Sequence, residues 1–323
     1  MKILGTFIAI AIALTGIVAP AAAADYPTGP IKIVVPYPAG GTADIFARII
    51  GAELSKAFHH PVFVDDRAGA GGNIGSDIVA KAAPNGHTLL LGSSGSNAVN
   101  PSLFKQMPYN AWTDLVLVAP VASAINVLVV GAGHKAKSVA DLLAMAKAKP
   151  DSVTFGSSGN GSVLHLSGVM LANMSGTKMI HVPYKGTPPA LLDVLTSRVD
   201  FMFANAPSVV SDIKAGKLRA LAVSTKYRMK ELPDVPTLDE SGMKGYDLSS
   251  WWAVFAPAKT PPAIVEKLNA AIRKTLNEPA IEARFESMGS KPLIMGAEES
   301  QKFFLSELKL WGDLVKASGA TVN

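Results

Sequence analysis

The sequence predicts an α/β protein of the doubly wound type, divided into two lobes. Apolar runs rich in β-branched residues alternate with helix-like stretches over most of the 323 residues, which is the pattern of βαβ units. The runs are continuously apolar, as expected for strands of a parallel sheet that is buried on both faces. A chain of about 300 residues usually forms two domains. Near 114–130 and near 224–236, prolines interrupt the pattern, so we expect the chain to cross between the lobes twice.

The first 24 residues are typical of a secretory signal peptide. Lys2 supplies the positive start, Ile3 to Val18 form the apolar core, and Ala21 to Ala24 provide an A-x-A cleavage site. The alternative is an uncleaved membrane anchor, but the small-residue site follows the core immediately and the chain has no cysteine for a lipid. We therefore expect a periplasmic protein that begins near Ala24 or Asp25. No later apolar run approaches the roughly 20 residues of a membrane helix.

The predicted elements follow one another in order along the chain. Expected strands cover 31–35, 61–65, 87–92, 114–122, 125–130, 152–156, 178–184, 199–204, 218–224 and 251–257. Expected helices between them cover 43–57, 138–149, 161–174, 187–197 and 207–215. Three further helices are expected at 261–278, 279–289 and 297–317, and the first begins with prolines at its first turn. This helical tail has no sheet of its own, so it must pack on a lobe. The predicted lobes are 25–122 with 226–323, and the inserted segment 123–225.

The composition argues against several classes of function. The 30 basic and 25 acidic residues give a formal charge of +5, without a basic run of the kind that binds nucleic acid. Without cysteine there is no disulfide and no thiolate metal site, and the six histidines lack metal-ligand spacing. GAGGNIG is one residue away from the dinucleotide fingerprint, and neither a Walker loop nor a nucleophile elbow is present. We therefore expect no cofactor, no metal and no catalytic residue.

Short loops rich in glycine and serine follow the predicted strands. They are PYPAGGTAD (36–44), DDRAGAGGNIGSD (65–77), GSSGSNAVN (92–100), SSGNGSVLH (157–165) and KGTPPA (185–190). In open α/β sheets, ligands bind at the carboxyl ends of the strands, and a helix start there offers free N–H groups to an anion. Any one of these loops alone has a simpler explanation, because glycine and serine commonly cap helices. Several loops at one edge favour a binding site for an anion.

Single residues in these loops leave alternatives open. Asp44 is expected to cap its own helix by accepting from the N–H groups of Gly41 or Thr42, and to pair with Arg48. That pairing would leave the N–H groups of Gly40 to Thr42 free for a ligand. His165 falls in the first turn of a helix, where a structural role and a ligand role both stay possible. The same holds for aromatic residues that either line a site or pack in the core, namely Tyr37, Tyr184, Trp251 and Trp252.

Six stretches together resemble the Bug family, the periplasmic solute receptors of tripartite tricarboxylate transporters. They are IKIVVPYPAGGTADIFARIIG, VFVDDRAGAGGNIGSDIVAKAAPNGHTLLLG, VTFGSSGNGSVLHLSGVML, IHVPYKGTPPALLDVLTSRVDFMF, LAVSTKYRMKELPDVPTLDESG and WWAVFAPAKTPPAIVEKLN. The resemblance covers essentially the whole mature chain. It implies a two-lobed periplasmic-binding-protein fold (a type II-like Venus flytrap) with two crossing strands. It also implies an organic carboxylate in the cleft: a di- or tricarboxylate, an aromatic acid or an acidic amino acid.

The resemblance also implies which residues bind the ligand. Carried onto this sequence, they are Tyr37, Ala39, Gly40, Gly41, Thr42, Gly72, Asn73, Ser93, Ser157, Ser158, Ser162, His165, Tyr184 and Lys185. The chain departs from the family at Asp66, where asparagine is usual and where a ligand loop begins, which leaves the ligand's identity open. The implied partners are the small carboxylate and the subunits of an inner-membrane permease, with the receptor itself a monomer.

Two other functions use the same residues. A secreted enzyme on this fold would employ Ser158 or His165 in chemistry, and it would need a nucleophile, a base and an orienting group, a set that the sequence does not reveal. A sensor subunit would present its closed form to a signalling partner, and it would share the ligand site of a transport receptor.

Overall fold

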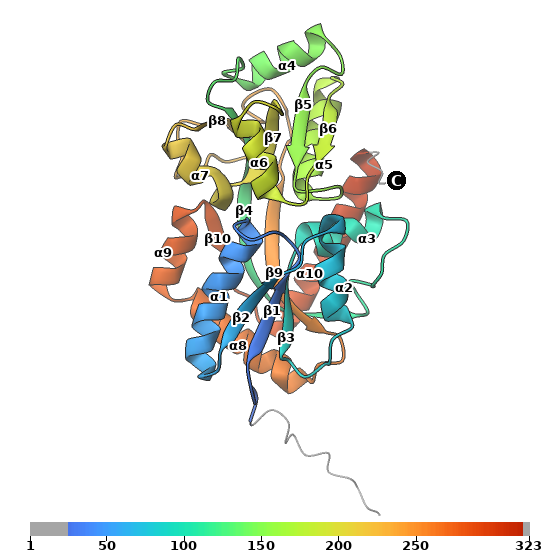
Figure 1. Ribbon diagram of the computed structural model, residues 1–323, viewed down its shortest axis with the longest axis vertical. Coiled ribbons are helices and arrows are strands. Elements are labelled where there is room, and N and C mark those ends of the chain that lie inside the picture. The colour runs from blue at the N-terminus through green and yellow to red at the C-terminus, as the bar shows by residue number, and fades with distance from the viewer. Residues whose placement is uncertain (1–24, 319–323) are drawn as a thin grey trace, which may run out of the picture.

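The computed structural model describes residues 25–318 and shows two α/β lobes stacked along the long axis of the molecule (Figure 1). The predicted signal peptide lies outside these residues. Among residues 25–318, no helix combines the length and the apolar character needed to cross a membrane.

The first lobe is built on a mixed sheet with the strand order β2-β1-β3-β9-β4-β10. The strands are β1 (Ile31–Val35), β2 (Val62–Asp66), β3 (Thr88–Ser93), β9 (Ser249–Pro257), the first part of β4 (Leu115–Gly131) and β10 (Ser290–Pro292). Strand β1 pairs in parallel with β2 and β3, whereas β9 is antiparallel to both β3 and β4.

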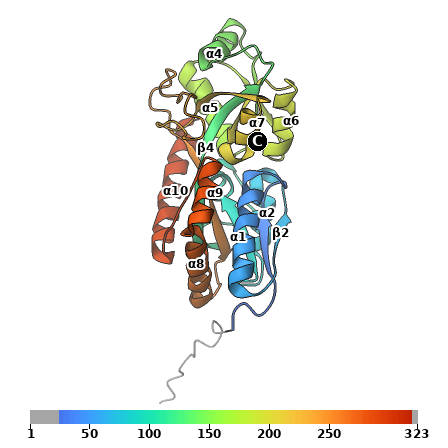
Figure 2. The same cartoon turned by 90° about the vertical axis from the view of Figure 1, so that its left-hand side faces the viewer.

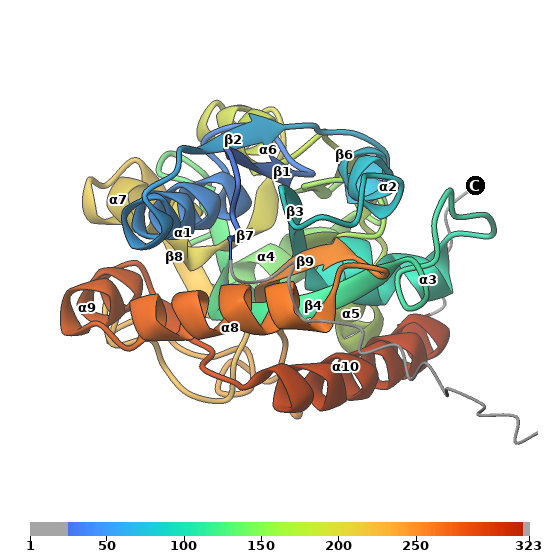
Figure 3. The same ribbon diagram turned by 90° about the horizontal axis from the view of Figure 1, so that it is seen from below.

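Helices bury both faces of this first sheet, and the view from below shows them around the strands (Figure 3). Ile33 of β1 packs in the core with α1 (Thr42–Phe58), α8 (Pro262–Leu276) and α9 (Pro279–Ser287). Its neighbour Val34 belongs to the opposite core, with α2 (Asn73–Ala80), the π-helical turn η2 (Gly95–Val99), α3 (Asn100–Leu103) and α10 (Ala297–Ser318). Because both faces are covered, β1 is apolar at consecutive positions, as predicted.

The second lobe has the strand order β8-β4-β7-β5-β6. Its strands are β5 (Thr154–Ser157), β6 (Ile180–Pro183), β7 (Phe201–Asn205), β8 (Leu218–Val223) and the second part of β4. Helices α6 (Thr187–Leu195) and α7 (Ala206–Lys214) pack on one face, and α4 (Val139–Ala148) and α5 (Val163–Ser175) pack on the other.

The prediction of parallel sheets is confirmed for β2-β1-β3 and for β7-β5-β6, but it is wrong for the strands that join the lobes. Strand β4 leaves the first lobe for the second and β9 returns, so the two lie side by side in opposite directions. Strand β4 changes partners between Ile125, which pairs with β9, and Asn126, which pairs with β7. The lobe boundaries given above stay a prediction.

Pro120 does not separate two strands, contrary to the expectation of strands at 114–122 and 125–130. Residues 115–131 form one strand, and the register against β9 shifts between Leu117 and Ala119 and again between Pro120 and Ala122. A bulge on each side accommodates the missing N–H of proline within the ladder. The sequence analysis also omitted several short elements: η1 (Ala70–Gly72), α2, η2, α3 and β10.

Helix α10 contacts both lobes. It packs on β4, η2 and α3 of the first lobe and on α5 of the second, and it runs along one side of the molecule (Figure 2). The expectation that the helical tail packs on an existing lobe is therefore confirmed, with the addition that the last helix also reaches the other lobe.

Candidate functional site

A cavity of about 40 Å³ lies between the two sheets, where the loops after β1, β3, β5, β6 and β7 meet. Both lobes contribute to its wall. Its lining residues are Tyr37, Pro38, Gly41, Thr42, Ala43, Ser93, Ser94, Gly95, Ser158, Ser162, Val163, Leu164, Thr187, Pro188, Asn205, Ser250 and Trp252. This is the strand edge at which the sequence predicted a site.

Four helices begin at this cavity: α1, α5, α6 and α7. Three of them start without a side-chain cap, at Gly41, Gly186 and Asn205. The fourth, α5, is capped because Ser162 accepts from the N–H of His165 at 3.1 Å. Of the described residues that line the cavity, none is Asp, Glu, Lys or Arg. Prolines in the first turns of α6 and α7 (Pro188, Pro189 and Pro207) remove N–H groups there, but the dipoles of the four helix starts and the absence of a carboxylate in the described lining still suit an anion.

The loop PYPAGGTAD places Gly41 and Thr42 at the cavity and turns Gly40 away from it. Asp44 accepts from the N–H of Gly40 at 2.8 Å and pairs with Arg48 at 2.7 Å. The pair with Arg48 is as predicted, but the expectation that Asp44 bonds Gly41 or Thr42 is wrong. The expectation of free N–H groups also fails for Gly40 and for Gly41, whose N–H donates to the carbonyl of Pro38 at 3.4 Å. Gly40 adopts a φ of 79°, which folds the loop back over the helix start and brings its own N–H to the carboxylate.

Six of the predicted ligand residues line the cavity: Tyr37, Gly41, Thr42, Ser93, Ser158 and Ser162. The hydroxyl groups of Tyr37 and Ser93 lie 2.8 Å apart. Burial raises the pKa of Tyr37, so its phenol stays neutral and adds no charge to the site.

The other eight predicted residues lie outside the lining: Ala39, Gly40, Gly72, Asn73, Ser157, His165, Tyr184 and Lys185. Gly72 stands behind Tyr37, because a Cβ on Gly72 would lie 3.2 Å from the Tyr37 hydroxyl. Asn73 is buried and accepts from Asn100 at 2.7 Å. The second glycine-rich loop therefore supports the wall from behind.

Tyr184 and Lys185 are not among the residues that line the cavity. The Tyr184 hydroxyl donates to Asp193 at 2.6 Å, and burial raises the pKa of Tyr184 to about 12. The side chain of Lys185 is exposed.

The buried Ser157 and His165 and the partly buried His181 form a group behind the start of α5. The Ser157 hydroxyl lies 2.6 Å from His181 Nε2, and the two imidazole rings stack at 3.9 Å. Burial lowers the pKa of His165 to about 4. Burial, together with the neighbouring His165, lowers the pKa of His181 to about 3. Both rings are therefore neutral at neutral pH, and His165 holds the loop from behind by accepting from the N–H of Gly161 at 3.4 Å.

Trp252, which was left open between the site and the core, lines the cavity, and ten further lining residues were not predicted individually: Pro38, Ala43, Ser94, Gly95, Val163, Leu164, Thr187, Pro188, Asn205 and Ser250. Eight of them lie inside the loops quoted above, where the sequence does not tell which residues face the cavity. Ser250 and Trp252 lie on β9, an antiparallel strand that meets the cavity at its beginning, and no rule about strand ends points to them.

The two tryptophans of β9 have different roles. Trp251 packs against Phe303 and donates to Glu307 at 2.6 Å, so it belongs to the core around α10. Trp252 lines the cavity and packs edge-on against Phe46 with ring centroids 5.2 Å apart.

The lobes touch around the mouth of the cavity, so the structure is a closed form. The hydroxyl groups of Thr42 on the first lobe and Ser208 on the second lie 2.8 Å apart. Gly186 of the second lobe packs directly on the ring of Pro38, since a Cβ added to this glycine would lie 2.3 Å from Pro38 Cδ.

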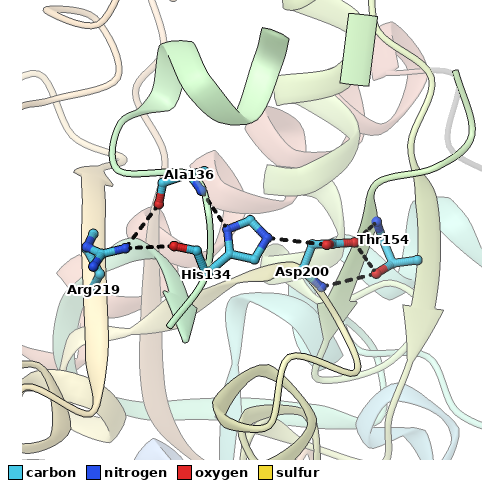
Figure 4. A network of polar contacts seen from close by, with 5 residues as sticks. All are labelled: His134, Ala136, Thr154, Asp200 and Arg219. Atoms are coloured by element: carbon cyan, nitrogen blue, oxygen red, sulfur yellow. Dashed lines mark hydrogen bonds and ion pairs between the residues drawn. The ribbon is translucent and has the colours of Figure 1, made fainter. Parts of the chain in front are cut away.

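A second polar network lies away from the cavity, at the far end of the second lobe (Figure 4). Arg219 donates to the carbonyl groups of His134 and Ala136 at 3.1 and 3.2 Å. The ring of His134 lies 3.3 Å from Asp200, which accepts from the N–H and the hydroxyl of Thr154. These bonds tie the loop after β4 to the starts of β5 and β7, which is a structural role.

Comparisons with known proteins agree with this geometry. Residues 46–320 match the profile described as "Tripartite tricarboxylate transporter family receptor". Protein BugT of Bordetella pertussis is 38% identical over 324 residues, which span 100% of this chain and 98% of that protein.

Solved structures of similar chains have the same fold. R. palustris Rpa4515 with adipate has a TM-score of 0.89 at 34% identity, covering 92% of this chain and 100% of that one. Periplasmic binding protein BugD has a TM-score of 0.87 at 32% identity, covering 92% and 99%. MatC from Rhodopseudomonas palustris with bound malate has a TM-score of 0.85 at 30% identity, covering 90% and 100%. The expected two-lobed periplasmic-binding-protein fold is confirmed.

Proposed function

The chain belongs to the tripartite tricarboxylate transporter receptor family, of which the Bug proteins are members, and we propose that it is a periplasmic receptor for a small organic carboxylate. It binds the carboxylate between its lobes and delivers it to an inner-membrane permease of the tripartite tricarboxylate type. The receptor acts as a monomer. The site is formed by the six predicted residues on the cavity wall together with the lining residues of α6, α7 and β9.

The observation that carries this proposal is the meeting of four helix starts at a cavity with no charged side chain among its described lining residues. Each helix start carries about half a positive charge. A carboxylate therefore finds favourable dipoles and N–H donors without an arginine clamp, and one at each end of the ligand would engage both lobes. Two similar chains were solved with the dicarboxylates adipate and malate, which fits a cavity shared by the lobes.

The small size of the cavity implies that the lobes must open to admit a ligand and then close on it. The 40 Å³ is the volume open to the centres of water molecules, and one water needs about 10–15 Å³ on that measure, so the closed cavity has room for about three waters. A dicarboxylate enters only when the lobes move apart, and its contacts with both lobes then favour the closed form.

An enzymatic function has one observation in its favour, the hydrogen bond between Ser157 and His181. Two properties of the pair argue against chemistry. Ser157 is fully buried and outside the cavity lining. The pKa of His181, lowered to about 3, makes the ring a poor general base at neutral pH. We therefore propose that the chain catalyses no reaction on its ligand.

A thermal-shift screen of mono-, di- and tricarboxylates, aromatic acids and acidic amino acids tests the proposal. A ligand at about 100 times its dissociation constant adds about 2.7 kcal/mol to the free energy of unfolding, which is an easily measured rise in melting temperature. The ligand should then be recovered intact by mass spectrometry after incubation. The receptor proposal fails if no organic carboxylate stabilises the protein. Turnover that is lost in Ser157→Ala would instead support the enzyme.

Delivery to a permease is tested separately in cells. Uptake of the labelled ligand should depend on the chain, and a strain without it should lose high-affinity uptake. Intact uptake alongside a lost transcriptional response to the ligand would favour the sensor alternative.

A further inference from the structure

A closed ring of hydrogen bonds lies at the point where β4 passes from one lobe to the other. Its members are Asn126 on β4, Asn205 at the end of β7 and Ser250 on β9. All three are buried, with exposed fractions of 0%, 6% and 3%. The amide of Asn205 donates to Asn126 Oδ1 at 2.7 Å and to Ser250 Oγ at 2.9 Å. Ser250 Oγ donates in turn to Asn126 Oδ1 at 2.9 Å.

The ring spans the junction between the lobes. Asn126 and Asn205 are register partners within the second sheet, whereas Ser250 pairs with Ala124 in the first. A rotation of the second sheet away from the first therefore leaves the bond between the asparagines intact. The same rotation stretches the two bonds that Ser250 makes across the junction.

The second chain crossing meets the ring at the same place. The N–H of Asn126 donates to Ser224 Oγ at 3.2 Å, and the carbonyl of Asn126 accepts from the N–H of Ser224 at 2.9 Å. The N–H of Leu248 donates to the carbonyl of Ser224 at 2.9 Å, just before β9 begins. Asn126 thus contacts both connections between the lobes.

Two members of the ring also line the ligand cavity. Asn205 and Ser250 are wall residues, while Asn126 lies outside the lining. Asn126 Nδ2 is fully buried without a hydrogen-bond partner, an arrangement that costs free energy. A residue with no buried NH₂ group would avoid the cost of the unpartnered Nδ2, so a purely structural role at this position does not require an amide. What the amide of Asn126 supplies is the acceptor Oδ1, which accepts two of the three hydrogen bonds of the ring.

From this arrangement, and on the basis of the proposed receptor function, we infer that Asn126 is a positioning residue that couples ligand binding to closure. It holds Asn205 and Ser250 in the orientation that the closed cavity requires. Loss of its acceptor removes one of the two bonds across the junction and leaves Asn205 and Ser250 bonded only to each other within the ring. The closed form is then less stable, and a ligand that depends on that form leaves sooner.

The test compares Asn126→Ala with a matched control elsewhere in the chain, Asn269→Ala. Asn269 is also fully buried, donates to the carbonyl groups of Val118 and Met295, and likewise has one unpartnered amide atom, Oδ1. It lies on α8, outside the cavity lining. Both substitutions should lower the melting temperature, but only Asn126→Ala should act on closure and binding.

Closure is measured without ligand. The chain has no cysteine, so Lys56→Cys on α1 and Lys214→Cys on α7 give a unique pair of spin labels, one on each lobe. In the Asn126→Ala protein the distribution of distances between the labels should shift to longer values, and in the Asn269→Ala protein it should match the parent. For a carboxylate found in the screen, Asn126→Ala should weaken binding about tenfold, mainly through a faster dissociation rate.

Each outcome decides the inference. An unchanged distance distribution in folded Asn126→Ala overturns it, as does a shifted distribution with unchanged affinity, because coupling is the claim. Equal effects of Asn269→Ala on distance and affinity also overturn it. If Asn126→Ala does not fold, Ser250→Ala removes a single hydroxyl and should shift the distances in the same direction, and no shift there refutes the inference. If no carboxylate binds the parent protein, the proposed function fails, while the label distances still decide whether Asn126 stabilises the closed form.

Discussion

A single methyl group at Gly186 should act as a wedge that holds the cleft open. A Cβ at this position would lie 2.3 Å from Cδ and 2.6 Å from Cγ of Pro38, and a proline ring cannot rotate away as a flexible side chain would. Gly186 has a φ of 162°, which is extended backbone that alanine adopts without strain. The clash is therefore specific to the contact between the lobes, and it disappears when they separate.

The size of the effect follows from the cost of overpacking. Forcing extra carbon into a packed contact typically costs about 1–3 kcal/mol. Only the closed form pays this cost, so it appears almost entirely in the affinity for the ligand. At about 1.4 kcal/mol for each factor of ten, Gly186→Ala should weaken binding by about fivefold to roughly 150-fold. Without ligand the lobes can separate and relieve the clash, so the melting temperature of the ligand-free protein should change much less than the affinity.

Titration calorimetry, melting temperature and small-angle scattering on the same proteins make the measurement. The variant should bind more weakly and should show a smaller compaction on adding ligand. Gly133→Ala is the matched control on the same lobe, because a Cβ there meets nothing within 4 Å. Wild-type affinity and wild-type compaction in Gly186→Ala would refute the idea that this contact limits closure.

Three further changes test the wall and its support. Gly41→Val should weaken ligand binding at least tenfold in calorimetry without unfolding the protein, because Gly41 has an ordinary φ of −80° and the added methyl groups crowd the start of α1; unchanged affinity would contradict an anion site there. Ser158→Ala and Ser162→Ala should each reduce the affinity for the ligand. Only Ser162→Ala should also lower the free energy of unfolding, by about 1 kcal/mol, because Ser162 caps α5. A loss of stability with unchanged affinity would show that these serines have no role in binding. Burial lowers the pKa of His165 to about 4, below the unfolded value of about 6.5. Between these two pH values the protein therefore takes up a proton when it unfolds. The contribution of this group to stability should be complete above about pH 6.5 and should decline as the pH falls to about 4. His165→Gln should make that part of the curve of melting temperature against pH less steep, with the rest of the slope due to His181, and an unchanged curve would contradict the burial of the His165 ring.

The elements of the fold were predictable where a local pattern decides them. The run IKIVV gave β1 with its observed bounds, Ile31–Val35, because a strand buried on both faces needs no information beyond its own apolar residues. The direction of β4 and β9 was not predictable in this way. It depends on which lobe each end of the strand belongs to, and that is a property of the whole chain. Pro120 was misleading because bulges in the pairing with β9, a strand more than a hundred residues later, accommodate it.

In the candidate site, too, some residues could be predicted from a local motif and others could not. Gly41 and Thr42 were identified because a glycine-rich loop before a helix has a local physical meaning. His165 occupies a similar position in the sequence, one turn into α5, yet its ring faces Phe155 and His181 and supports the loop from behind. Sequence spacing places a residue near a helix start, but the side on which its ring packs depends on neighbours from other strands. Asn205 and Ser250 are paired across 45 residues, and no single motif contains both.

The glycines at the mouth of the cleft explain why the loops pointed to a ligand without identifying it. A Cβ on Gly71 of the first lobe would lie 2.6 Å from the carbonyl of Asn160 on the second. A Cβ on Gly161 of the second lobe would lie 2.4 Å from Asn100 Oδ1 on the first. Gly71 and Gly161 also have φ angles of 64° and 81°, which favour glycine on their own, whereas at Gly186 the approach of one lobe to the other is the reason for glycine. These glycines determine how far the cleft closes, whereas the neighbouring serines and β9 determine what fits inside. A glycine-rich loop is therefore evidence for a closing cleft, and the chemistry of the ligand must be derived from residues such as Ser250 and Trp252, which the loops do not contain.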